Sequence, residues 1–143
     1  MNQASLLDSA TRPSKGLHIG LWVAQVLLAI AFGMAGAFKL TAPIEVLVQK
    51  MIWPGTMPPG VVRFIGASEL TGAIGLILPA ATRIRPGLTP LAALGLLVIM
   101  LLAMMFHLSR GELGALPAPI FLGAIAAFIA WGRFRKAPIT PRA

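Results

Sequence analysis

The stretch from Phe64 to Pro79 contains one carboxylate, Glu69, among residues that otherwise carry no charge. A charged side chain in such an apolar segment is costly in a membrane, so it is expected to face other helices and to have a partner. A carboxyl group in an apolar cleft can also exchange protons near neutral pH. Glu69 is therefore the first candidate for acid–base chemistry.

Other ionisable residues occur at the ends of neighbouring apolar segments. Lys39 closes the first segment, Arg63 opens the second and His107 ends the third, and alternating helices bring these three ends to one side. We predict that Glu69 and His107 form a proton relay in a polar site between helices. The expected ligand-binding residues of this site are Lys39, Arg63, Ser68, Arg110 and Glu112.

Each of these residues also has a purely structural interpretation. The bases at segment ends can extend to lipid headgroups, as long basic side chains usually do. Glu69 can pair with Lys39 and set the register of two helices without any chemistry. His107 can be an ordinary interfacial histidine. The site hypothesis rests on an acid, a histidine and two bases falling on one side of a small bundle.

Several functional classes are excluded or disfavoured. The chain has no cysteine, so a disulfide, a thiolate metal site, an iron–sulfur cluster or a dithiol relay cannot come from it alone. No metal site or P-loop is predicted, and basic residues without interleaved aromatics do not indicate nucleic-acid binding. Haem is disfavoured, because His18 and His107 are expected on opposite sides of the bilayer; a ligand pair of His107 with Met100 or Met104 stays open.

The elements that position these residues follow from hydropathy. Of the 143 residues, 57% are apolar and 11% are charged, and the mean hydropathy is +0.86. Four apolar runs are each about 20 residues long, enough to cross a bilayer as helices, and none alternates as a strand would. We predict an all-α, integral membrane four-helix bundle over residues 16–132, with spans at 17–38, 61–82, 87–107 and 115–132. Residues 1–15 and 133–143 are expected to be mobile tails.

A short amphipathic helix is expected between the first two spans. Its apolar residues recur three and four positions apart, opposite charged and polar ones, over a length too short to cross the membrane. The apolar face consists of Ile44, Leu47, Val48 and Met51. Trp53, which follows, is expected at headgroup level.

The basic residues predict the orientation. Eight lie on the side of the termini, namely Arg12, Lys15, Arg83, Arg85, Arg133, Arg135, Lys136 and Arg142, and four on the other, namely Lys39, Lys50, Arg63 and Arg110. The excess predicts that both termini are cytoplasmic. An alternative interpretation treats the first segment as a signal peptide cleaved near Ala35-Gly-Ala37, although its apolar run is longer than usual.

Three motifs carry a family resemblance: "GAFKL" from residue 36, "RFIGASELTGAIGLILP" from Arg63 and "HLSRGE" from His107. Together they resemble the DoxX-like family of small bacterial membrane proteins, over about residues 17–131. The resemblance implies a four-helix fold in the bacterial inner membrane. It also implies a link to redox chemistry, because relatives include a subunit of a thiosulfate:quinone oxidoreductase and partners in oxidative-stress complexes. The absence of cysteine argues against a thiol-based role here.

Two hypotheses of different classes follow. In the first, the chain is a membrane component of a redox system that holds a quinone-like molecule against Glu69, His107 and Lys39, with a partner redox subunit. In the second, it is a non-catalytic helper or lipid-binding protein whose polar cluster is structural. A proton-transfer isomerase ranks below both. Small residues such as Gly123 and Ala127 in the last span suggest a homo-oligomer.

Overall fold

Four helical segments are long and apolar enough to cross a membrane in the computed structural model, which describes residues 13–143. Within this range the chain is helical and has no strand, so the prediction of an all-α bundle with a short additional helix is confirmed. The elements are α2 (Lys15–Thr41), α3 (Ile44–Met51), η1 (Trp53–Thr56), α4 (Pro59–Thr82), α5 (Leu88–Ser109), η2 (Leu113–Ala115), α6 (Pro117–Trp131) and η3 (Gly132–Lys136).

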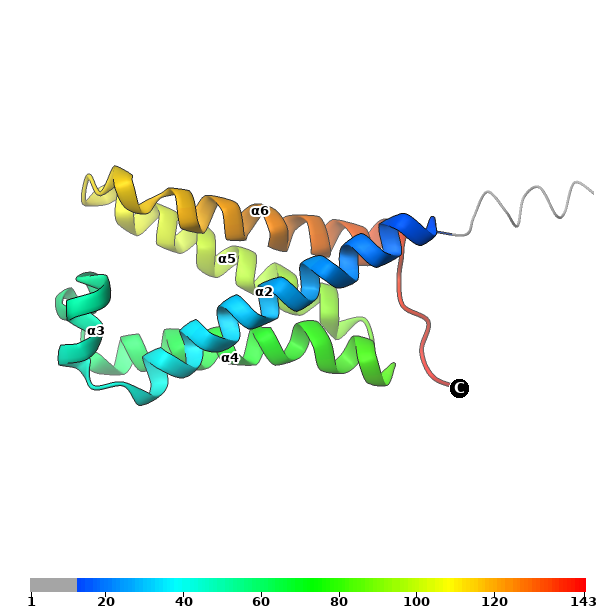
Figure 1. The fold of residues 1–143 in the computed structure, drawn as a ribbon, viewed down its shortest axis with the longest axis horizontal. Coiled ribbons are helices and arrows are strands. Elements are labelled where there is room, and N and C mark those ends of the chain that lie inside the picture. The colour runs from blue at the N-terminus through cyan, green and yellow to red at the C-terminus, as the bar shows by residue number, and fades with distance from the viewer. Residues whose placement is uncertain (1–12) are drawn as a thin grey trace, which may run out of the picture.

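The long helices form two pairs, α2 with α4 and α5 with α6 (Figure 1). The N-terminal part of α2 lies near the end of α6, and its C-terminal part lies along α4. Towards the end that carries α3, the two pairs diverge, and α3 with η1 covers that end.

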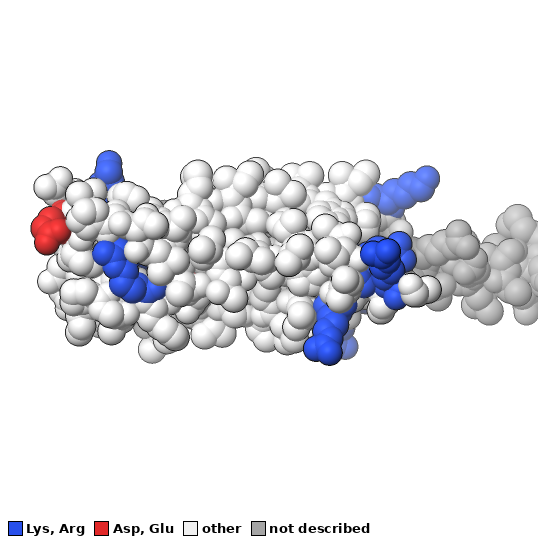
Figure 2. Space-filling model, turned by 90° about the horizontal axis from the view of Figure 1, so that it is seen from below, with Lys and Arg blue, Asp and Glu red and all other residues white. Residues whose placement is uncertain are grey.

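The outer surface matches a lipid environment. Figure 2 shows a broad band without charged side chains between two ends where the charged side chains gather. Large apolar side chains of the spanning helices are exposed, among them Ile30, Phe64 and Leu102, which are 53%, 72% and 60% exposed. Lipid chains, rather than water, are the environment in which such a surface is stable.

The helix that follows α2 is amphipathic, as its residue spacing predicts. Its central Leu47 is fully buried and packs with Ala42 and Val62, while Glu45 lies in the first turn, where the helix dipole favours a negative charge. The helix ends at Ile52, whose φ of 61° turns the chain sharply into η1. This turn brings η1 back over the end of the bundle.

The structure differs from the expected tails and from the expected small-residue surface. The helical turn η3 extends to Lys136, and Arg133 is only 3% exposed, so the first residues of the expected basic tail are packed. Of the expected N-terminal tail, residues 1–12 lie outside the described range and Lys15 belongs to α2. Gly123 is buried against Met100 of α5, so it is not free to contact a second copy.

Two glycines allow α2 and α4 to approach closely. A Cβ atom added at Gly36 would lie 2.6 Å from the carbonyl oxygen of Gly66 and 2.7 Å from the amide nitrogen of Leu70. A Cβ atom at Gly66 would lie 2.8 Å from Cβ of Lys39 and 2.9 Å from the Gly36 carbonyl oxygen. The two helices therefore contact each other through backbone atoms at this crossing, as membrane helices commonly do where small residues meet.

This crossing gives the first prediction. Gly36→Ala is expected to destabilise the protein by about 1–3 kcal/mol, because the added methyl group meets backbone atoms that cannot move aside. Gly20→Ala, on the same helix but with open space around its Cβ position, is the control and should leave stability nearly unchanged. Thermal unfolding in mild detergent measures both. Equal melting temperatures for the two variants would contradict the close crossing.

Candidate functional site

The intramembrane carboxylate Glu69 is bound by Lys39. The lysine Nζ lies 2.9 Å from Oε1 and 2.6 Å from Oε2 of Glu69, and the two side chains are 8% and 4% exposed. Lys39 comes from the last turns of α2 and Glu69 from the middle of α4, one turn beyond Gly66. The close glycine crossing thus places an ammonium and a carboxylate together, sheltered from lipid.

Arg63 of α4 contacts the backbone at the end of α2, next to the Lys39–Glu69 pair. Its guanidinium donates a hydrogen bond to the backbone carbonyl of Lys39. The last carbonyls of a helix lack partners within the helix, so Arg63 satisfies one of them at the end of α2. The sequence predicted Arg63 as a ligand-binding residue, but its side chain is occupied with this helix end and does not line the cavity described below.

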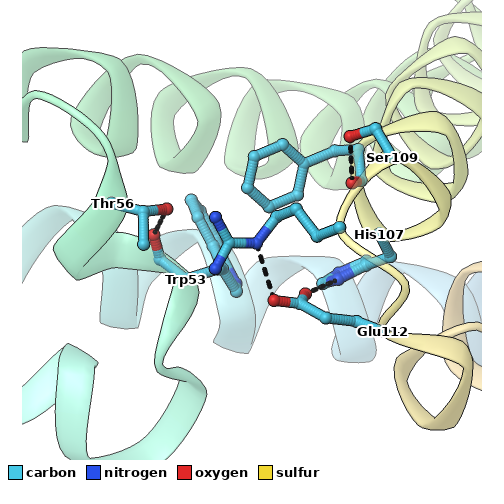
Figure 3. A network of polar contacts seen from close by, with 7 residues as sticks. Trp53, Thr56, His107, Ser109 and Glu112 are labelled. Atoms are coloured by element: carbon cyan, nitrogen blue, oxygen red, sulfur yellow. Dashed lines mark hydrogen bonds and ion pairs between the residues drawn. The ribbon is translucent and has the colours of Figure 1, made fainter.

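A second charged cluster follows α5. Figure 3 shows Glu112 between His107 and a guanidinium, that of Arg110: His107 Nδ1 lies 2.7 Å from Oε2 of Glu112, and Arg110 Nε donates to Oε1 at 2.6 Å. The loop is tight because the amide of Glu112 donates to the His107 carbonyl and Gly111 adopts a φ of 70°. A left-handed conformation of this kind suits glycine.

The position of Glu112 affects its titration. Hydrogen bonds from Arg110, and then from His107, hold the pKa of the Glu112 carboxyl below its ordinary value. Both donors favour the charged form of the carboxylate, and the carboxyl group remains partly accessible to solvent. Glu112 therefore acts as an anion that orients the His107 ring and the Arg110 guanidinium.

A cavity of about 390 Å³ lies between the two charged clusters. Its lining is mostly apolar and comes from all four long helices and from η1. Of the predicted site residues, Lys39, Ser68, Glu69 and His107 line it, whereas Arg63, Arg110 and Glu112 do not. The Ser68 hydroxyl donates to the Phe64 carbonyl at 2.9 Å, so its oxygen keeps free acceptor capacity towards the cavity.

Trp53 is a site residue that sequence reasoning missed. The headgroup-level position predicted for it included no role in the site, yet it lines the cavity, with its ring edge-on to Phe106 at a centroid distance of 6.5 Å. The Lys39 ammonium lies 5.9 Å from the centre of the same ring. Trp53 therefore connects the α2–α4 pair with α5 and covers one end of the cavity. In the sequence, Trp53 directly follows the amphipathic helix and precedes Pro54-Gly55, which indicates a turn. This position was the feature from which a fold back over the bundle could have been predicted.

Glu69 and His107 face the same cavity but are bonded to different partners. Among the hydrogen bonds of residues 13–143, none joins the two side chains. A proton that passes from one to the other would have to cross the cavity through a bound molecule or water. Within the same residues, no group of three or more His, Cys, Asp or Glu side chains is placed to hold a metal ion.

Comparison with known families identifies the chain. The sequence model of the DoxX-like family matches residues 23–129, three quarters of the chain. The chain belongs to the DoxX-like family. No curated protein and no solved structure matches it. The match begins within α2, ends near the end of α6 and includes all the DoxX-like motifs noted in the sequence.

The second prediction tests the ion pair of this DoxX-like protein. Lys39→Met is expected to destabilise the fold by about 3–5 kcal/mol, because it leaves the Glu69 carboxylate buried without a counter-charge. The double variant Lys39→Met/Glu69→Leu should recover most of this loss, since it removes both charges. Unfolding free energies of the two single variants and the double variant form the cycle. If the double variant loses as much unfolding free energy as the two single variants together, the two side chains do not interact.

The third prediction concerns the pH range in which the Glu112 cluster persists. Because the folded-state pKa of Glu112 is lowered, its bonds are fully present above the ordinary carboxyl pKa and are lost as the pH falls through the lowered value. Arg110→Gln should move this pKa back towards the ordinary value, whereas Lys50→Gln, at an exposed base on α3, should not. Carboxyl carbon NMR of labelled protein follows the titration. An unchanged Glu112 titration in Arg110→Gln would contradict the assigned cause.

Proposed function

We propose that this DoxX-like membrane protein binds an apolar small molecule with a polar head, of the quinone type, in the cavity between its two helix pairs. In this proposal it serves as the membrane component of a redox system. The observation that carries the proposal is the cavity itself, apolar over most of its lining and polar where Lys39, Glu69, Ser68 and His107 meet it. Small-molecule sites commonly have this composition, and about 300–1,000 Å³ is their usual size.

Access from the bilayer supports a lipophilic ligand. Phe64 of α4 and Leu102 of α5 both line the cavity, yet 72% and 60% of their surface is exposed on the lipid-facing band. A molecule dissolved in the bilayer can therefore reach the cavity between these helices without passing through water. A soluble polar substrate would have to enter past Trp53 and the charged residues of the loop end.

The polar groups suit a quinone headgroup. The Lys39 ammonium can donate a hydrogen bond to a quinone carbonyl oxygen. Glu69 and His107 can each take up a proton from solvent and pass it on, so they can relay the two protons that accompany reduction of a quinone to a quinol. The electrons must come from a bound cofactor or from a partner subunit, since the chain contains no cysteine. A partner redox subunit is therefore part of the proposal.

The charge distribution supports a location in the bacterial inner membrane with both termini in the cytoplasm. Seven of the described basic residues lie at the end of the bundle that carries the termini, and they are Lys15, Arg83, Arg85, Arg133, Arg135, Lys136 and Arg142. Four lie at the end that carries α3, namely Lys39, Lys50, Arg63 and Arg110. The cavity would then open near the outer leaflet.

One observation favours a second candidate function, that of a non-catalytic helper. Lys39 and Glu69 satisfy each other, and His107 is bonded to Glu112, so both clusters are complete without a ligand. In that case the polar residues hold the helices in register and the cavity contains lipid chains. The two candidates differ in whether a quinone headgroup binds with measurable selectivity.

The fourth prediction separates these functions. Ala103→Phe places a ring in the cavity and is expected to weaken binding of a short-chain quinone by about tenfold or more, because it fills the volume the headgroup needs. Ala124→Phe, at an exposed position of α6 outside the cavity, is the matched control. Quenching of tryptophan fluorescence in detergent measures the affinity, since Trp53 lies against the cavity.

Glu69→Gln tests whether the carboxylate takes part in proton transfer. It keeps the shape of the side chain but removes its charge and its proton-accepting oxygen, so quinone-dependent turnover with the partner should be lost while the protein still folds. Quinone affinities that are equal in the wild type, Ala103→Phe and Ala124→Phe would refute the cavity as the site. A wild type with no measurable quinone affinity would leave the helper function as the better explanation.

A further inference from the structure

The opposite end of the bundle contains a buried arginine that has no acidic side chain as a partner within residues 13–143. Arg133 of η3 is 3% exposed, and its Nε donates to Oε1 of Gln25 at 2.6 Å while Nη1 donates to the Ala137 carbonyl at 3.1 Å. Its remaining nitrogen, Nη2, is buried and has no hydrogen-bond partner among the residues that the structure describes. Both oxygen acceptors are neutral amides, so the guanidinium charge is not compensated by these contacts.

Hydrogen-bond donors outnumber acceptors around this arginine. Trp22 Nε1 lies 3.2 Å from Nε2 of His18, and Arg133 Nη1 lies 3.2 Å from Nδ1 of the same ring. Tryptophan and arginine can only donate, and an imidazole ring that accepts at one nitrogen carries a proton on the other. His18 can therefore accept from only one of the two residues. At least one further donor in the cluster lacks an acceptor, in addition to Nη2 of Arg133.

The carboxylate side chains of the described residues all lie away from this cluster. Glu45 lies in α3, Glu69 is paired with Lys39, and Glu112 follows α5 at the other end of the bundle. The fourth acid of the sequence, Asp8, precedes the described residues. The neighbours of Arg133 at this end include the exposed bases Arg135 and Lys136, so the local charge is positive.

A cavity of about 210 Å³ adjoins the buried guanidinium. Its lining comes from the start of α5, from η3 and from the C-terminal segment, and consists of Pro86, Gly87, Pro90, Arg133, Phe134, Pro138 and Ile139. The N-terminus of a long helix carries a partial positive charge and attracts anions. Among residues 13–143, the hydroxyl of Thr89 in the first turn of α5 is likewise buried without a partner, although Thr89 does not line the cavity.

We propose that this cavity binds an anionic phosphate group, and that in the membrane the group belongs to the headgroup of an anionic phospholipid. A phosphate group in the cavity supplies the acceptor that Nη2 of Arg133 lacks, and its charge compensates the guanidinium and the partial positive charge at the N-terminus of α5. Phe134 is 47% exposed beside the cavity, so the attached acyl chains can lie on the apolar band while the phosphate occupies the cavity. Basic pockets at a membrane surface bind anionic lipids in this way.

The experiment compares lipids that differ only in headgroup charge. The full-length protein, delipidated in neutral detergent, is titrated with phosphatidylglycerol, with phosphatidylcholine of the same acyl chains, and with inorganic phosphate, and binding is followed by native mass spectrometry and by the melting temperature. Arg133→Gln is compared with Arg135→Gln, which removes the same charge from an exposed neighbour. Gly87→Leu is a second variant that narrows the cavity and leaves Arg133 in place, since a side chain at Gly87 meets open space.

Phosphatidylglycerol is expected to bind about tenfold or more tightly than phosphatidylcholine and to raise the melting temperature. Arg133→Gln and Gly87→Leu should lose this preference, and Arg135→Gln should keep it. If Arg133→Gln does not fold, Gly87→Leu decides the matter. Inorganic phosphate that stabilises the protein as well as phosphatidylglycerol would assign the cavity to a free phosphate group.

Two results would overturn the proposal. One is a preference for phosphatidylglycerol that survives in both Arg133→Gln and Gly87→Leu, because the lipid would then be held by surface charge alone. The other is an Asp8→Asn variant that, in the absence of lipid, destabilises the protein as much as Arg133→Gln does. That result would show that the guanidinium is compensated by a carboxylate of the chain itself.

Discussion

The contact of α2 with α4 through Gly36 and Gly66 is the constraint on which the site depends. It lets the two backbones touch, and one turn further along the same interface it brings the Lys39 ammonium against the Glu69 carboxylate. Larger residues at either glycine would separate the helices and leave an ionised group facing lipid, which is unfavourable. The close crossing also holds α2 along α4 at the end that carries α3, where the cavity lies between this pair and the pair of α5 and α6.

The two ends of the bundle differ in how their charges are compensated. At the end with α3, each cluster contains its own counter-charge: Lys39 with Glu69, and Arg110 with Glu112. At the end with the termini, Arg133 is buried among neutral partners. A compensated, mostly apolar cavity suits an uncharged ligand, whereas an uncompensated guanidinium suits an anion. The same four helices thus present two environments of different chemical preference, one for each side of the membrane.

Hydropathy alone predicted the four spans, and the amphipathic spacing from Ile44 predicted α3, because these features depend on local sequence. The sheltered position of Glu69 was also predictable, since its cost in lipid demands a partner. The contact partners of Arg133 and Trp53 could not be predicted in this way. Gln25 meets Arg133 across 108 positions, and Trp53 reaches the cavity only because Ile52 turns the chain back. Such contacts depend on the rotation of whole helices, which a single sequence does not specify. Arg133 itself was assigned to a tail because its basic neighbours resembled one.

The complete ion pair does not prevent ligand binding at the same place. An ammonium group has three donors, and Lys39 directs its contacts to two oxygens of one carboxylate, which leaves a donor for a third acceptor. A carbonyl oxygen in the cavity can therefore be bound without breaking the pair. A carboxylate or phosphate ligand bound to the same Lys39 donor, in contrast, would lie close to the negative charge of Glu69 and be repelled by it. The pair that stabilises the crossing thereby also favours neutral carbonyl ligands over anions in this cavity.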